Sequence, residues 1–178
     1  MPASQQIIYK ELSREESRKY LDSFEIQEYR SNPPSTDWYD SDSASLYVWI
    51  IDVTNEEEIP IGFIGYNLFS TMNDEEFIYI MKFFVLKKYR KYNNENLIES
   101  IEGEKVSSLL FKNIMSKNKN IITLTPANER LSKYYEREYG FIYNKEISEK
   151  FADIVGVSIC ELMYLNLEVE TRRDKIEF

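Results

Sequence analysis

The sequence predicts an α/β fold with a mixed β-sheet, and two observations lead to that class. Apolar runs typical of strands are interleaved with segments whose apolar residues recur at helical spacing. The chain has 178 residues, of which 43% are hydrophobic and 30% are charged, a mixture typical of globular proteins. This length suits one domain of ordinary size, so we expect a single domain over residues 1–178.

The N-terminal quarter of the chain is expected to hold one strand, one helix and a loop. Residues 5–11 favour a first strand. Ser13 and Glu16 have the spacing of a capping box, which predicts a helix that begins just after Ser13. Residues 31–45 are rich in Pro, Ser and Asp, and this composition predicts a solvated loop.

The middle of the chain is expected to supply three strands and a helical region. Residues 46–54 and 59–70 are apolar runs joined by a polar turn, which predicts a β-hairpin. Residues 77–85 are apolar on both faces, as in a central buried strand. Residues 94–118 have a helical composition, but their apolar residues change face at Gly103, so we expect a kink or two helices there.

The C-terminal part is expected to add three strands around one helix. Residues 121–125 favour a short strand, and Pro126 suits the first turn of the following helix. Gly140 is placed to end that helix. Residues 141–147 and 157–168 are each predicted to form a strand that closes the sheet.

The composition excludes several classes of functional site. The chain has no histidine, which removes Ser-His-Asp and Cys-His catalysis and every His-ligated metal site, and we expect no metal. The single cysteine, Cys160, can form no internal disulfide and lies in an apolar pattern typical of a core residue. No apolar run is long enough for a membrane helix, and the N-terminus lacks the pattern of a signal peptide. We therefore expect a cytoplasmic protein without a membrane partner.

The charge distribution favours a small anionic ligand over a nucleic acid. The net charge of −9 argues against a nucleic-acid partner. The ten residues from Lys82 to Lys91 nevertheless contain five cations and no anion. Such a cluster on an acidic protein favours a discrete anionic ligand, while solvated lysines at the end of a strand are the alternative explanation.

Three segments match the motif order of one enzyme family. Residues 128–141 (NERLSKYYEREYGF) follow the pattern Asn-x-x-Ala-x-x-Leu-Tyr with a later Gly-Phe, except that a leucine replaces the small residue and one extra residue precedes Gly140. Residues 79–90 (YIMKFFVLKKYR) follow a strand with the exit Val-x-Pro-x-Tyr-Arg, with Lys87 in place of the proline. Residues 61–65 (IGFIG) match the preceding strand. In these segments the chain resembles the GNAT superfamily of acyl-CoA-dependent N-acyltransferases.

The resemblance implies a fold, an activity and a general acid. The fold would be a single GNAT-like domain with a twisted, mixed and mostly antiparallel sheet, flanked by helices on both faces. The activity would be transfer of an acetyl group from acetyl-CoA to a primary amine by direct attack, with a small cationic amine or a peptide or protein amine as acceptor. Tyr135 would be the general acid, because a phenol of pKa about 10 can protonate the departing thiolate while it remains protonated at neutral pH. A packed core tyrosine is the alternative for this residue.

The resemblance also implies residues that bind the coenzyme. The main chain of Phe83, Phe84 and Val85 would pair with the pantetheine arm like an added strand. The other implied contacts are those of Arg90 and Lys91 with the phosphates, those of Asn93 and Asn94 in the phosphate loop, and that of Asn128, for which a helix cap is the alternative.

Two departures from the family pattern leave a second hypothesis open. The family's loop Arg/Gln-x-x-Gly-x-Gly/Ala corresponds to Arg90, Asn93 and Glu95, so both glycines are missing, unless an insertion displaces the loop to Gly103. Met81 stands where the family often has the glutamate that deprotonates the amine, so no general base is assigned. The alternative function is therefore a catalytically inactive GNAT-like module for binding or protein interaction. The acceptor and the oligomeric state, a homodimer included, are left open.

Overall fold

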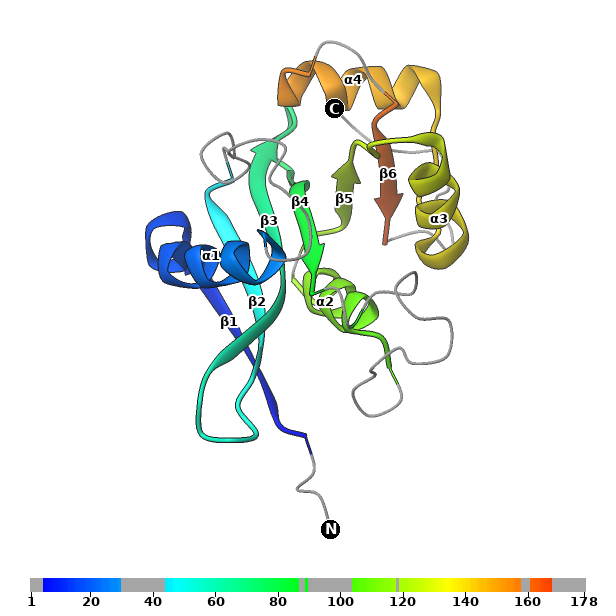
Figure 1. Cartoon of the computed structure of the whole chain (residues 1–178). Coiled ribbons are helices and arrows are strands. Elements are labelled where there is room, and N and C mark those ends of the chain that lie inside the picture. Colours follow the sequence, from blue (N-terminus) through cyan, green and yellow to red (C-terminus); the bar gives the residue numbers. More distant parts are fainter. Residues whose placement is uncertain are drawn as a thin grey trace. The chain divides into compact units, whose positions relative to one another are not determined.

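The computed structural model describes residues 5–29, 44–86, 89, 104–117, 119–157 and 161–167, with the backbone alone described for residues 24–29. Six strands form one sheet in the order β1-β2-β3-β4-β5-β6 (Figure 1). The elements in chain order are β1 (Ile7–Ser13), α1 (Arg14–Tyr29), β2 (Leu46–Asp52), β3 (Ile59–Ser70), β4 (Glu76–Val85), α2 (Val106–Met115), β5 (Ile121–Leu124), α3 (Glu129–Tyr139), α4 (Lys145–Val155) and β6 (Met163–Asn166).

The chain divides into two compact units, and β3 and β4 contribute residues to both. The first unit comprises Met1–Tyr66 and Lys82–Ser116, and the second comprises Asn67–Met81 and Lys117–Phe178. The pairs β1–β2, β2–β3 and β5–β6 are antiparallel, whereas β4 and β5 are parallel. The predicted α/β class with a mixed sheet is therefore confirmed.

The first unit has helices on opposite faces of its strands. The indole Nε1 of Trp49 on β2 donates a hydrogen bond to the Ser17 hydroxyl of α1 at 2.8 Å, and both residues are fully buried. The neighbouring Ile50 lies beside Gly62 of β3, where the Leu110 side chain of α2 also packs. Because adjacent residues on a strand point to opposite faces, α1 and α2 cover opposite faces of this part of the sheet.

The start of α1 confirms the predicted capping box. The backbone N–H of Ser13 donates to the Glu16 carboxylate at 3.0 Å, and the N–H of Glu16 donates to the Ser13 hydroxyl at 3.1 Å. Two backbone donors that have no partner within the helix are satisfied in this way, which fixes the first turn at Arg14.

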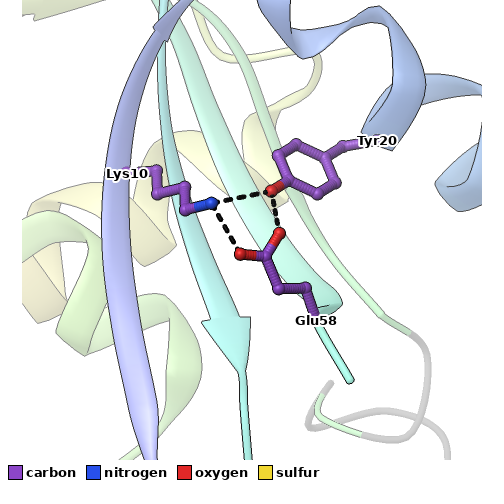
Figure 2. Close-up of polar contacts among 3 residues, drawn as sticks. All are labelled: Lys10, Tyr20 and Glu58. Atoms are coloured by element: carbon purple, nitrogen blue, oxygen red, sulfur yellow. Dashed lines mark hydrogen bonds and ion pairs between the residues drawn. The ribbon is translucent and has the colours of Figure 1, made fainter. Parts of the chain in front are cut away.

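A charged cluster joins three segments of the first unit (Figure 2). Lys10 of β1 donates to the Glu58 carboxylate at 2.6 Å and to the Tyr20 hydroxyl of α1 at 3.2 Å. The Tyr20 hydroxyl in turn donates to the second oxygen of Glu58. The hydrogen bond from Lys10, followed by that from Tyr20, lowers the pKa of Glu58, and the same carboxylate raises the pKa of Lys10. The cluster therefore links β1, α1 and the turn that precedes β3.

The second unit is built around the pairing of β4, β5 and β6. Ile78 to Ile80 of β4 pair with Ile122 to Leu124 of β5, and all of β5 pairs with β6. The Thr123 hydroxyl, which is fully buried, donates to the Ile78 carbonyl at 2.9 Å. The buried core cluster of this unit consists of Phe77, Tyr79, Ile121, Phe151, Ala152, Leu162 and Tyr164.

The predicted strand at residues 141–147 is wrong. Only Ile142 makes an isolated bridge, to Tyr164, and α4 begins at Lys145. The Asn144 side chain accepts a hydrogen bond from the N–H of Ile147 and caps the helix, while Ile147 and Phe151 have the four-residue spacing of a helical apolar face. The prediction followed the aromatic and β-branched residues that precede Asn144, and the cap outweighs them.

Three further sequence predictions have different outcomes. The strand expected at 157–168 is limited to Met163–Asn166 among the described residues. Pro126 does not lie in a first helical turn, because α3 begins at Glu129 with Asn128 as its N-cap. Gly140 ends α3 as predicted, with the left-handed φ of 79° that glycine adopts without a steric penalty. The predicted break at Gly103 and the environment of Cys160 lie outside the described residues.

Within the described ranges, no helix combines the length and the apolar character that a membrane crossing requires.

Candidate active site

The residues expected to bind the pantetheine arm lie at the carboxyl end of β4, in the first unit. The Phe83 ring meets Phe111 of α2 edge-on, with a centroid distance of 5.1 Å. The Phe84 ring stacks on Phe63 of β3 at 6.1 Å. The two rings are half-buried and contact different elements, so they anchor the backbone of this strand segment.

Gly62 on β3 allows the backbone of β4 to approach closely. A Cβ atom at this position would lie 3.0 Å from the Phe84 carbonyl oxygen and 3.1 Å from the Leu110 side chain of α2. A larger residue would push against the main chain that is expected to pair with the coenzyme. The Ile-Gly-Phe-Ile-Gly strand, unspecific as a motif, thus has a packing role here.

Strand β4 continues beyond the end of its parallel partner. Ile80 pairs with Leu124, the last residue of β5, whereas β4 extends to Val85. The main chain of Phe83 to Val85 therefore lies past the last register position that β4 shares with β5. After β4, the N–H of Leu86 donates to the Ile61 carbonyl at 2.9 Å, which returns the chain to β3.

The candidate phosphate-binding residues follow Tyr89 directly in the chain. Arg90, Lys91, Asn93 and Asn94 all lie outside the described residues. Tyr89 just before them is buried, and its hydroxyl accepts a hydrogen bond from the Gln5 side chain at 3.2 Å. The chain is therefore anchored at Tyr89, directly before Arg90.

Asn128, in the second unit, forms the helix cap that the sequence left as an alternative. Its side-chain oxygen accepts a hydrogen bond from the N–H of Leu131 at 2.9 Å. This contact satisfies one of the free donors in the first turn of α3. A contact of Asn128 with the coenzyme remains a prediction.

Tyr135 lies on the buried side of α3, in the second unit, with its side chain 8% exposed. Its ring meets Tyr134 and Phe141 edge-on, at centroid distances of 5.5 and 5.9 Å. Burial, with a smaller effect of Tyr134, raises its pKa to about 12. The phenol is therefore protonated at neutral pH, as a proton donor must be.

Met81, which stands where the family often has a glutamate, lies in an apolar environment in the structure. Met81 packs against the core cluster of the second unit. Sequence reasoning missed a polar contact made by Tyr79, two residues before Met81 on β4. Its hydroxyl lies 2.9 Å from the hydroxyl of Thr125, which follows β5. The available signal was the Thr-x-Thr spacing of residues 123 and 125 at the end of a short strand.

Solved structures are similar to this chain in fold, although no family model matches the sequence and no curated protein is significantly similar to it. Arabidopsis thaliana NAA60, determined in complex with a bisubstrate analogue, aligns with a TM-score of 0.52 and 11% sequence identity, over 90% of this chain and 98% of that chain. An acetyltransferase of the GNAT family from Streptococcus pneumoniae aligns with a TM-score of 0.50 and 11% identity, over 90% of this chain and 99% of that chain.

The sheet order and these similarities define the fold of the chain. The parallel pair β4–β5 follows the antiparallel pairs β1–β2 and β2–β3 and precedes the antiparallel pair β5–β6. The chain has the fold of the GNAT acetyltransferases, which is the fold that the resemblance implied.

Proposed function

We propose that the protein transfers an acetyl group from acetyl-CoA to a primary amine. The observation that carries the proposal is the position of Tyr135 on α3 of a GNAT fold, where the family has its general acid. The NAA60 structure with its bisubstrate analogue supports a two-substrate reaction on such a fold.

In the proposed mechanism, acetyl-CoA supplies an activated thioester when it is bound. The main chain of Phe83 to Val85 binds the pantetheine arm, and its position past the end of β5 supports this role. Arg90 and Lys91 bind the phosphates through charge-assisted hydrogen bonds. Tyr135 donates its phenolic proton to the sulfur as the amine nitrogen forms its bond to the carbonyl carbon.

The remaining coenzyme contacts and the acceptor follow from the motifs and the charge. Asn93 and Asn94 bind the pyrophosphate through backbone N–H groups, since asparagine tolerates left-handed backbone better than other non-glycine residues. Asn128 contacts the coenzyme beside its capping role. The net charge of −9 favours a cationic acceptor, either a small amine or a peptide or protein amine. The protein is proposed to act in the cytoplasm as one domain over residues 1–178, without a nucleic-acid or membrane partner.

A second candidate function has a specific observation in its favour. Met81 replaces the usual glutamate and is packed into an apolar cluster, and the phosphate loop lacks both glycines. A GNAT-like module that binds coenzyme or a partner protein without turnover has both properties. The two functions differ in whether bound acetyl-CoA reacts.

Two measurements on the intact protein test the proposal. Calorimetric titration with acetyl-CoA is expected to show affinity in the micromolar range. In an assay with a panel of cationic and neutral amines, at least one amine is expected to be acetylated, with release of the free thiol of coenzyme A. Binding without thiol release across the panel would favour the inactive module. The absence of any heat or thermal shift at millimolar acetyl-CoA would overturn the coenzyme-dependent function altogether.

A further inference from the structure

The Tyr79–Thr125 hydroxyl pair lies beside the parallel pairing of β4 with β5. Tyr79 on β4 is in register with Thr123 of β5, and Thr125 is the first residue after β5. The two hydroxyl oxygens are 2.9 Å apart. Both residues and α3 belong to the second unit.

The pair joins the apolar core to solvent. The Tyr79 side chain is only 6% exposed, and its ring belongs to the core cluster of the second unit. Thr125 is exposed. The hydroxyl pair therefore lies where the apolar core of the second unit meets a residue that is open to solvent.

The pair has hydrogen-bonding capacity beyond its mutual bond. Each hydroxyl offers one donor and two acceptor lone pairs, and a single bond between them uses one donor and one acceptor. The neighbouring Thr123 hydroxyl differs, because it is buried and donates to the Ile78 carbonyl at 2.9 Å. Thr123 thus serves the packing of β4 on β5, whereas the Tyr79–Thr125 pair retains capacity for a ligand.

The location favours an acceptor amine as that ligand. Met81, the next residue of β4 on the same face as Tyr79, offers no polar atom that could hold an amine. In the chain, Thr125 stands between the last residue of β5 and Asn128, the cap of the helix that carries Tyr135.

We propose that the Tyr79–Thr125 hydroxyl pair binds and orients the acceptor amine, an inference that rests on the proposed acetyl transfer. Tyr79 donates its hydroxyl hydrogen to Thr125, and its lone pairs accept a hydrogen bond from an N–H of the amine. The nitrogen lone pair then forms the bond to the thioester carbonyl carbon as the carbon–sulfur bond breaks. The amine proton passes to solvent, the sulfur receives the proton of Tyr135, and solvent returns a proton to the Tyr135 phenolate.

Steady-state kinetics with the intact protein test this assignment. Tyr79→Phe and Thr125→Val are each expected to raise the KM for the amine, or lower kcat/KM, by about tenfold, because each removes part of one hydrogen-bonded group. The double variant is expected to be little worse than either single variant, since both remove the same interaction. Acetyl-CoA affinity, measured by calorimetry, should stay within twofold of that of the parent.

Two further variants separate binding from packing. Tyr164→Phe, in the same core cluster but on β6, is expected to leave the KM for the amine unchanged, and Thr125→Ser is expected to restore most of what Thr125→Val loses. An active parent whose KM and kcat/KM for the amine survive both Tyr79→Phe and Thr125→Val would overturn this inference alone. A parent that binds acetyl-CoA but acetylates no amine would overturn the proposed function and this inference with it.

Discussion

The pKa of the Tyr135 phenol depends on the burial of its side chain. A phenol at the surface has a pKa of about 10. Burial against Tyr134 and Phe141 raises the pKa of Tyr135 to about 12, because the charged phenolate is poorly solvated there. The residue therefore holds its proton throughout the pH range in which an amine becomes nucleophilic.

Removal of the phenolic oxygen at this position tests its role as an acid. Tyr135→Phe keeps the ring and its edge-on contacts, so acetyl-CoA affinity should barely change. Turnover should fall by roughly 10²–10⁴-fold, the range for a lost general acid. Thiol release and thermal melts of both proteins measure the two effects. Full activity in the Phe variant, or a loss of stability with turnover per folded molecule intact, would identify a core tyrosine instead.

The raised pKa also predicts a pH dependence of stability. In the unfolded chain this phenol has a pKa near 10.0, whereas in the folded protein its pKa is about 12. Folding therefore retains the proton more tightly, and the contribution of Tyr135 to stability is complete below pH 10 and is lost as the pH rises toward 12. Denaturant melts across this range should show a steeper decline for the parent than for Tyr135→Phe. Parallel declines would contradict the raised pKa.

At the scale of elements, the cap of α3 separates two roles of Asn128. Asn128→Ala removes the acceptor for the Leu131 N–H and should cost about 1 kcal/mol of stability. Asn128→Ser keeps a capping oxygen and should restore that stability. If the amide also contacts the coenzyme, the Ser variant will be stable but will bind acetyl-CoA more weakly. Calorimetry and denaturant melts on the same samples distinguish the roles, and unchanged affinity in the Ser variant would assign Asn128 to the cap alone.

The Lys10–Tyr20–Glu58 cluster is expected to contribute to stability, because it links β1, α1 and the turn before β3. Glu58→Gln removes the charge opposite Lys10 and should cost no more than about 1 kcal/mol, since both groups are partly exposed. The pKa of Glu58 is lowered in the folded state, so its contribution is present above the unfolded value of 4.5 and is lost as the pH falls through the lowered value. Melts at pH 7 and at pH 3 check this, with Glu57→Gln as the matched control. An equal loss at both pH values would contradict the electrostatic explanation.

At the scale of the whole molecule, the basic segment from Lys82 to Lys91 contrasts with the net charge of −9 of the chain. Arg90→Ala combined with Lys91→Ala should weaken coenzyme A binding and leave the melting temperature almost unchanged, because charge-assisted bonds to phosphate are stronger than those of solvated cations. The pair Lys145→Ala and Lys150→Ala on exposed positions of α4 is the control for net charge. A double variant that binds coenzyme A as tightly as the parent would place the phosphates elsewhere, with the region of Gly103 as the next candidate.

Much of the fold could be predicted because its signals are local. The capping box of Ser13 and Glu16, the hairpin strands and the glycine that ends α3 each depend on residues a few positions apart. Helix α4 was missed although its signals are also local. The apolar residues next to Asn144 satisfy the strand pattern, and the choice between strand and helix depends on the cap and on packing of Phe151 against Phe77.

The sequence by itself determined the class of fold, the absence of histidine chemistry, and the candidate acid and coenzyme segment. Only the tertiary structure decided which of these side chains are buried and which polar groups meet. The burial of Tyr135 and the contact between Tyr79 and Thr125 depend on how α3 packs and on the register of β4 with β5. Periodicity shows which face a residue occupies, whereas a contact between residues far apart in the chain requires the register and packing of whole elements, which no short stretch of sequence encodes.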